Sequence, residues 1–125
     1  MKLLFTFIVL VTFSIQGADK PNFILFITDD ISWDDLGCYG SKVAKTPHLD
    51  QMAKEGMLFH GAYLSISSCS PSRCSLITGR YPHNTGASEL HTSMPADQPV
   101  FPEALQAAGY YTAISGKHHM GKAVN

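Results

Sequence analysis

The sequence predicts an α/β domain with a mostly parallel sheet flanked by helices. Short apolar runs occupy residues 22–28, 57–65 and 110–115, and helical patterns separate them. Strands that alternate with helices in this way are joined by crossover connections, which favour parallel pairing. Three strands do not complete such a sheet, and we therefore expect the chain to be the front part of a larger domain.

The first apolar run, residues 22–28, reads Asn-Phe-Ile-Leu-Phe-Ile-Thr and lies between Pro21 and two acids. Its apolar residues are continuous rather than alternating, which is typical of a parallel strand buried on both faces. We therefore expect these residues to form a central strand.

A helical pattern opens at Thr46 and Pro47 and ends near Gly56. Proline is favoured at the first position of a helix and glycine just after the last. Residues 57–65 then form the second predicted strand. The Pro- and Ser-containing residues 68–80 suit a loop that runs into a short helix.

Residues 81–100 are rich in Pro, His, Asn, Ser and Thr, and we expect a loop there. Residues 102–108 predict a helix that Gly109 closes, and residues 110–115 are the third predicted strand.

The start of the chain is typical of a secretory signal peptide over residues 1–18. Lys2 precedes an apolar run over residues 3–13, and a small or polar stretch follows it. The apolar run is much shorter than the roughly 20 residues that span a bilayer, so we expect no stable membrane insertion. Residues 19–125 would then be the mature part of an exported protein, whether secreted, periplasmic or lysosomal.

The composition excludes several classes of protein. Nine Lys and Arg against ten Asp and Glu give a net charge of −1, and 45% of the residues are hydrophobic. The absence of clustered cations in the sequence argues against a nucleic-acid partner, and the hydrophobic content excludes a disordered chain. The three cysteines, Cys38, Cys69 and Cys74, allow one internal disulfide at most. The remaining sulfur is either a buried free thiol or a site of chemical modification.

Two adjacent acids, Asp29 and Asp30, follow the first predicted strand directly. Ligands bind at the carboxyl ends of strands in open α/β sheets, and paired carboxylates there suit a hard cation such as Ca²⁺ or Mg²⁺. A turn or a helix cap formed by the acids is the structural alternative. Asp34 and Asp35 are cap candidates or neighbours of such a site.

Cys69 stands just before Pro71 in a segment that can begin a helix, where the helix dipole favours an anion. Arg73 lies one turn further on and could direct its guanidinium to the same place. These residues predict an anion site beside a sulfur. The alternative is a structural cysteine in a polar loop.

Lys117 and His119 follow the third predicted strand. Side chains two residues apart on an extended segment project to the same side, so both could face one anion while His118 points away. A solvated basic loop, or a histidine pair that binds adventitious metal, is the alternative. The other histidines are expected at the surface or in structural positions: His83 and His91 in the polar loop, and His48 and His60.

Together the strand ends predict a divalent cation beside an anion pocket, which suits hydrolysis of a sulfate or phosphate ester. At this point the residues resemble a known family. The segment Cys69-Ser-Pro-Ser-Arg-Cys-Ser-Leu-Ile-Thr-Gly-Arg80 is similar to the signature of the type I sulfatases. Further similarity to the same family lies in Asp29-Asp30, Asp35-Leu-Gly-Cys-Tyr-Gly40, Thr46-Pro-His-Leu-Asp50 and Gly116-Lys-His-His-Met-Gly121. The segment around Cys69, with His83 and Asn84, is somewhat closer to the heparan N-sulfatases.

The resemblance implies an alkaline-phosphatase-like fold and one bound Ca²⁺, or Mg²⁺ in related enzymes. It also implies that a maturation enzyme converts Cys69 to formylglycine (3-oxoalanine), whose hydrate offers a hydroxyl nucleophile. By resemblance, Asp29, Asp30 and residue 69 bind the metal. Arg73 would hold the formylglycine oxygens, Lys117 the sulfate, and His119 a hydroxyl. The implied substrates are sulfated small molecules or sulfated glycans.

Two other functions stay open from the sequence. Relatives with the same signature core cleave phosphorus esters, so a phosphonate or phosphodiester hydrolase is one alternative. A non-catalytic secreted domain with a disulfide is the other. The resemblance also implies further metal ligands that cannot be placed in these 125 residues. We therefore expect the isolated chain to be an incomplete and inactive part of the enzyme.

Overall fold

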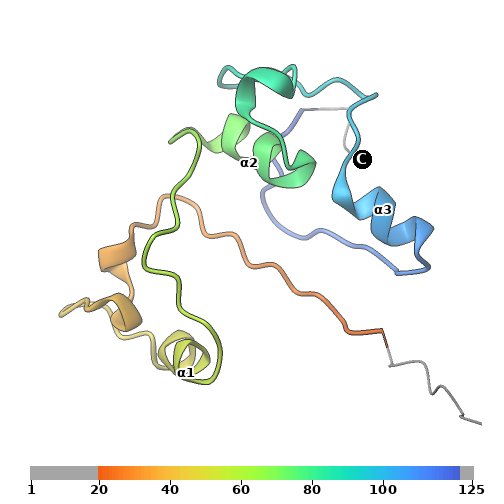
Figure 1. The fold of residues 1–125 in the computed structure, drawn as a ribbon. Coiled ribbons are helices and arrows are strands. Elements are labelled where there is room, and N and C mark those ends of the chain that lie inside the picture. The colour runs from red at the N-terminus through yellow and green to blue at the C-terminus, as the bar shows by residue number, and fades with distance from the viewer. Residues whose placement is uncertain (1–19, 122–125) are drawn as a thin grey trace, which may run out of the picture.

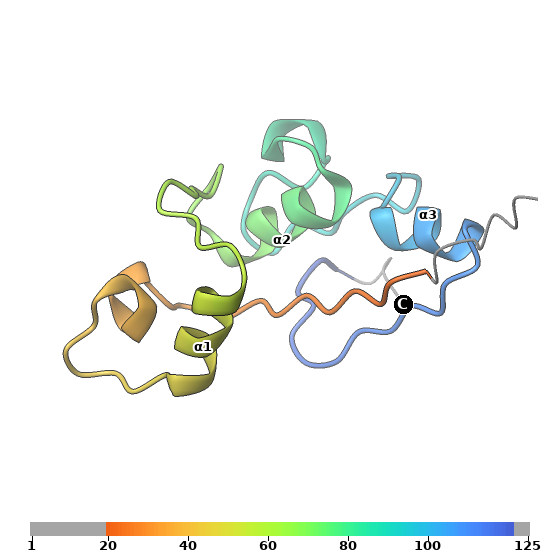
Figure 2. The same ribbon diagram turned by 60° about the horizontal axis from the view of Figure 1, so that its bottom comes forward.

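The structure is a computed structural model that describes residues 20–121. Its regular elements are all helical: η1 Trp33–Asp35, η2 Gly37–Tyr39, α1 Pro47–Glu55, α2 Cys69–Thr78, η3 Pro82–Asn84 and α3 Phe101–Ala107. The short helices η1 and η2 lie with α1 at one end of the molecule, and α2 and α3 lie at the other (Figure 1). The segment that follows Lys20 runs between the two ends as an extended stretch, which the turned view shows from a second side (Figure 2).

The helix α1 is held against η2 by a small polar cluster. Pro47 occupies its first turn, and Gly56 follows its last residue, as the sequence predicts. The Thr46 hydroxyl donates to Asp50 Oδ1 at 2.9 Å and accepts a bond from the Gly37 N–H at 2.9 Å. A Cβ at Gly37 would lie 2.5 Å from Asp50 Oδ2, so the absence of a side chain there allows η2 to approach the helix.

The helix α2 begins at Cys69 itself, earlier than the loop-then-helix pattern predicts, with Ser68 as its N-cap residue. It ends at Gly79, whose φ of 67° is in the left-handed region that glycine adopts without strain. Its buried residues are Ser70, Pro71 and Cys74. The predicted helix over 102–108 is also confirmed, one residue earlier, as α3.

The buried core lies between α2 and two irregular segments. It consists of Cys74, Ala87, Met94 and Met120, against which Ile77 and Val100 pack. The Met94 N–H donates to the Met120 carbonyl at 3.0 Å, which joins the two irregular segments. The polar residues 81–100 are mostly loop, as predicted, and yet they supply two of the four core residues.

The predicted strands are not formed in the part of the chain that the structure describes. Residues 22–28, 57–65 and 110–115 carry no strand assignment. The expectation that residues 22–28 are buried on both faces is wrong for this structure, because Ile24 is 79% and Phe26 82% exposed. A strand requires a hydrogen-bonded neighbour and apolar cover, and residues 20–121 provide neither for these segments.

The predicted signal peptide, residues 1–18, lies outside the described residues. Within residues 20–121, none of the helices has the length and apolar character needed to cross a membrane.

Candidate functional site

The carboxylate of Asp29 lies between two cations that come from distant segments. The Lys117 Nζ donates to its Oδ2 at 2.5 Å, and the Arg73 Nη2 donates to its Oδ1 at 3.3 Å. These two hydrogen bonds and the positive charges lower the pKa of Asp29, and burial opposes them only in part. The same contact raises the pKa of Lys117. Asp29 is therefore a carboxylate and Lys117 an ammonium group throughout the neutral range.

Arg73 holds this arrangement together through both arms of its guanidinium. Its Nη1 donates to the Lys117 carbonyl at 2.6 Å while its Nη2 faces Asp29. The side chain is only 10% exposed, so the charge sits at a largely shielded position on the first turns of α2. A planar fork that reaches two partners at once is a property that lysine lacks.

Cys69 is the first residue of α2 and is partly buried. Its sulfur is free, and Cys38 and Cys74 are free as well. After the hydrogen bond to Asp29, a coulombic interaction with Cys69 also raises the pKa of Lys117. The sulfur therefore lies within electrostatic reach of the Asp29 cluster, which consists of Asp29, Arg73 and Lys117. Cys74 differs, because it is fully buried and burial raises the pKa of its thiol. Of the two thiols on α2, Cys69 is the accessible one at a helix N-terminus.

His119 contacts His91, a partner that the sequence did not predict. Its Nε2 lies 3.0 Å from the Nδ1 of His91, and the two ring centroids are 5.0 Å apart. The pKa of His119 is lowered, first by burial and then by electrostatic interactions with Lys117, His91 and Arg73. The sequence offered no signal for His91 beyond its place in a polar loop.

Other predicted site residues are not drawn into this cluster. Asp30 adopts a left-handed φ of 54° and makes no ion pair within residues 20–121. Asp35 accepts a bond from the Ser32 N–H at 2.8 Å and so acts as a cap of η1, one of its two expected roles. His118 faces neither Asp29 nor His91 but lines a separate pocket.

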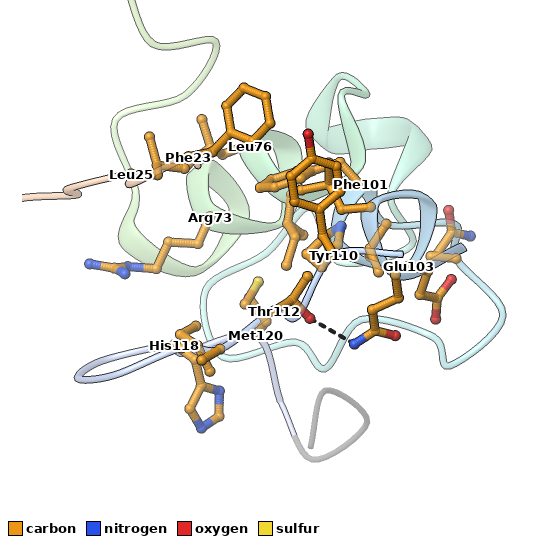
Figure 3. A pocket seen from close by; sticks show the side chains of 18 of the residues that line it. Phe23, Leu25, Arg73, Leu76, Phe101, Glu103, Tyr110, Thr112, His118 and Met120 are labelled. Carbon is orange, nitrogen blue, oxygen red and sulfur yellow. Dashed lines mark hydrogen bonds between the residues drawn. The ribbon is translucent and has the colours of Figure 1, made fainter. Parts of the chain in front are cut away.

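That pocket is apolar and lies between α2 and α3 (Figure 3). Its volume is about 570 Å³, and the tilted ring pair of Phe23 and Tyr110 forms part of its wall. Arg73 lines one end of the pocket, but its guanidinium extends away from the apolar walls (Figure 3). The charged chemistry is therefore outside the pocket, around Asp29.

The described residues offer the right type of ligand for a hard cation but too few of them. Asp29 and Asp30 are adjacent carboxylates, and carboxylate oxygen is the ligand type that Ca²⁺ and Mg²⁺ prefer. Calcium takes about six to eight oxygens. Residues 20–121 hold no group of three or more His, Cys, Asp or Glu side chains arranged for a metal ion. They can supply only part of a calcium shell.

Comparison with known proteins agrees with the sequence motifs. A family model described as Sulfatase matches residues 21–124. N-acetylgalactosamine-6-sulfatase of Sus scrofa is 41% identical over 121 residues, which cover 86% of this chain and 23% of that protein. Arylsulfatase G of Homo sapiens is 41% identical over 90% of this chain and 23% of its own length. Arylsulfatase A of Bos taurus is 37% identical over 97% of this chain and 25% of its own length.

The chain thus spans about a quarter of the length of the curated relatives it matches. No solved structure matches it significantly.

Proposed function

The chain belongs to the sulfatase family, and from this premise we propose that it carries the nucleophile, the anion-binding cations and part of the metal site of an exported sulfatase. The reaction is hydrolysis of a sulfate ester or an N-sulfate, with a nucleophile derived from Cys69. The names of its relatives point to sulfated sugars and aryl sulfates, and we propose a sulfated glycan as the substrate class.

One observation carries this proposal above all. Asp29, Arg73 and Lys117 come from three separate segments, and their charged groups meet beside the N-terminus of the helix that begins with Cys69. A structural ion pair would need one cation, whereas this cluster has two for a single carboxylate. The excess positive charge suits an anionic substrate such as a sulfate monoester.

The family resemblance suggests a role for each residue, and the contacts in the structure are compatible with it. Arg73 is shielded and lies in α2 one turn after residue 69, so it would bind oxygens on residue 69. The Lys117 side chain is 46% exposed, and its ammonium group would reach a sulfate oxygen from the open side. His119 carries a lowered pKa and is neutral at pH 7, so it can accept a proton from a hydroxyl on residue 69.

Residues Asp29, Asp30 and 69 would hold the divalent cation, which we propose to be Ca²⁺, with Mg²⁺ as the other candidate. When bound, the cation supplies positive charge against a sulfate oxygen and the nucleophilic oxygen. Formylglycine at position 69, made by a maturation enzyme, supplies the hydroxyl nucleophile that a thiol lacks. Asp29 already faces two cations, which lower its pKa, so its carboxyl group is in the ionised form that a metal ligand needs.

We also propose that residues 19–125 are the N-terminal part of an alkaline-phosphatase-like catalytic domain. Its sheet would include residues 22–28 and 110–115, whose apolar side chains are exposed here. These 125 residues alone are then inactive, because only two of their carboxylates, those of Asp29 and Asp30, are proposed ligands for a shell of about six oxygens or more. Clear turnover of an aryl sulfate by the isolated chain would contradict this part of the proposal.

The first test is the mass of the tryptic peptide from Glu55 to Arg73, prepared from protein made in its own host. This peptide contains Cys69 and excludes Cys74. We expect a peptide in which an aldehyde replaces the CH₂SH group of Cys69, and we expect Cys74 to be unchanged in its own peptide. An unmodified or disulfide-bonded Cys69 would overturn the nucleophile and favour a non-catalytic domain.

The second test uses the full-length enzyme and compares hydrolysis of an aryl sulfate with that of the matching aryl phosphate, with Cys69→Ala as the control. We expect preference for the sulfate and loss of activity in the control. Preference for the phosphate would assign the site to a phosphorus ester hydrolase.

A further inference from the structure

The ring contact between His91 and His119 carries an inference about the reaction itself. We propose that His91 is a positioning residue, which holds the His119 imidazole in one orientation and one tautomer for its work at residue 69. This inference rests on the proposed function, because the work of His119 is part of sulfate ester cleavage. His91 itself contacts neither Asp29 nor Arg73 in the hydrogen-bond pattern of residues 20–121.

The contact is built by the packing on either side of it. His91 and His119 lie 28 positions apart, yet the Met94 N–H donates to the Met120 carbonyl only a few residues away from both. Met94 and Met120 are each 3% exposed. Gly121 lies so close to Ser93 that a Cβ there would come within 2.5 Å of the Ser93 side chain. The loop that carries His91 is therefore docked on the segment that carries His119.

Both histidines have unusual backbone conformations. His91 has a φ of 65° and His119 a φ of 51°, in the left-handed region that non-glycine residues rarely adopt. Each such residue costs about 1 kcal/mol or more, and such strain concentrates at functional sites. The two strained positions are the two ends of one hydrogen bond. An incidental hydrogen bond between surface side chains would not require a left-handed backbone at both residues.

The chemistry of the bond determines the state of His119. A hydrogen bond between two imidazole nitrogens holds one proton, so one ring donates and the other accepts. The two facing nitrogens cannot both carry a proton. The pair of rings therefore carries one positive charge at most. The Nε2 of His119 is thereby engaged, and its Nδ1 is the nitrogen left to act.

The Nδ1 of His119 has the surroundings that this role needs. It is buried and has no hydrogen-bond partner within residues 20–121. A buried polar atom without a partner is rare and costs free energy, so its presence points to a partner that arrives with the reaction. His91 then fixes the nitrogen that must not react, as the partner of a metal-bound or catalytic histidine commonly does.

Two variants at one position separate a positioning role from a structural one. His91→Gly removes the imidazole, and glycine tolerates the φ of 65° without strain. His91→Asn also tolerates this conformation, and its side-chain amide occupies the place of Nδ1, so it can still bond to His119. His83→Asn is the control, because His83 stacks on Tyr81 away from the site.

The measurement is kcat and KM of the full-length enzyme from its own host for an aryl sulfate, together with thermal unfolding of each variant. We expect His91→Gly to lower kcat about 10- to 100-fold, the range for lost partners of catalytic groups, with KM within about twofold. We expect His91→Asn to recover most of the loss, and His83→Asn to match the wild type. A His91→Gly enzyme with wild-type kcat, a His91→Asn enzyme no better than His91→Gly, or a change confined to KM would each overturn the proposal.

A second readout does not depend on activity. Long-range ¹⁵N–¹H spectra of the histidine rings report which nitrogen carries the proton, and they can be recorded on the chain whether or not it turns over substrate. Because Nδ1 needs a free lone pair to accept a proton, we expect His119 to be the Nε2–H tautomer in the wild type and in His91→Asn, and a tautomer mixture in His91→Gly. Coupled rings in the chain, together with a full-length protein that has no sulfatase activity, would refute the proposed function alone. Two independent rings in an active sulfatase would refute the positioning role alone.

Discussion

The ammonium group of Lys117 lies 2.5 Å from the carboxylate of Asp29, across 88 residues of sequence. The rings of Phe23 and Tyr110 lie 5.7 Å apart at the other ends of the same two segments. The two contacts follow the same order along the chain, so the segments lie parallel. The two segments are thus aligned in parallel and share a charged end, although no strand hydrogen bonds join them within residues 20–121.

The Asp29 cluster leads to a prediction about metal binding. Asp29→Asn removes a carboxylate from the proposed calcium site and leaves Arg73 and Lys117 without their anion. We expect calcium affinity to fall about tenfold or more, because a neutral amide is a weaker ligand and the nearby cations then repel the metal. Calorimetric titration of the protein with Ca²⁺ measures this change.

Asp97→Asn is the matched control, because Asp97 is an exposed acid in the loop before α3. It has the same change in net charge, and we expect its calcium affinity to equal that of the wild type. An equal loss in both variants would mean that overall charge, rather than a site at Asp29, governs calcium binding.

The pH dependence of stability follows from the lowered pKa of Asp29. A carboxyl group whose pKa is lower in the folded state contributes stability above its unfolded pKa, here about 3.8, and this is lost as the pH falls through the folded value. We therefore expect urea denaturation at pH 6 to give a higher free energy of unfolding for the wild type than for Asp29→Asn. This difference should vanish at strongly acidic pH. The contact is exposed, so added salt should reduce the difference at pH 6. A difference that grows on acidification would contradict the ion-pair assignment.

The sequence predicts α1 and α3 to within a residue because their ends are local features: proline in the first turn and glycine at or after the last. It also groups Asp29, Arg73 and Lys117, because side chains at the carboxyl ends of parallel segments meet. It could not find His91, whose partner is fixed by the docking of Met94 on Met120. It could not find the core of the polar loop either, because one buried Thr and two apolar residues give no periodic pattern. The predicted strands depend on neighbours that residues 20–121 do not provide.

Thr85 tests the buried part of that loop. It is fully buried, and its hydroxyl donates to the Pro82 carbonyl at 2.8 Å and accepts from the Ala87 N–H at 3.1 Å. Thr85→Val keeps the shape and leaves the Ala87 N–H unpaired, whereas the Pro82 carbonyl still accepts from the Thr85 N–H at 3.1 Å. We expect the unpaired N–H to cost about 1–3 kcal/mol of unfolding free energy. Thr85→Ser keeps the hydroxyl and should cost about 1 kcal/mol for the lost methyl group. Urea denaturation compares them, and a Val variant at least as stable as the Ser variant would refute the role of the hydroxyl.

Gly121 tests the docking that brings His91 to His119. Its φ is 94°, and an added Cβ would lie 2.5 Å from the Ser93 side chain and 2.6 Å from the Ser93 Cα. Gly121→Ala therefore adds a steric clash to the cost of a left-handed alanine, and we expect a loss of about 2–5 kcal/mol. Gly79→Ala is the control, because its φ of 67° carries the same conformational cost with nothing within 4 Å of the new Cβ. We expect it to lose only about 1–2 kcal/mol. Equal losses by urea denaturation would mean that the contact between Gly121 and Ser93 does not hold the loop in place.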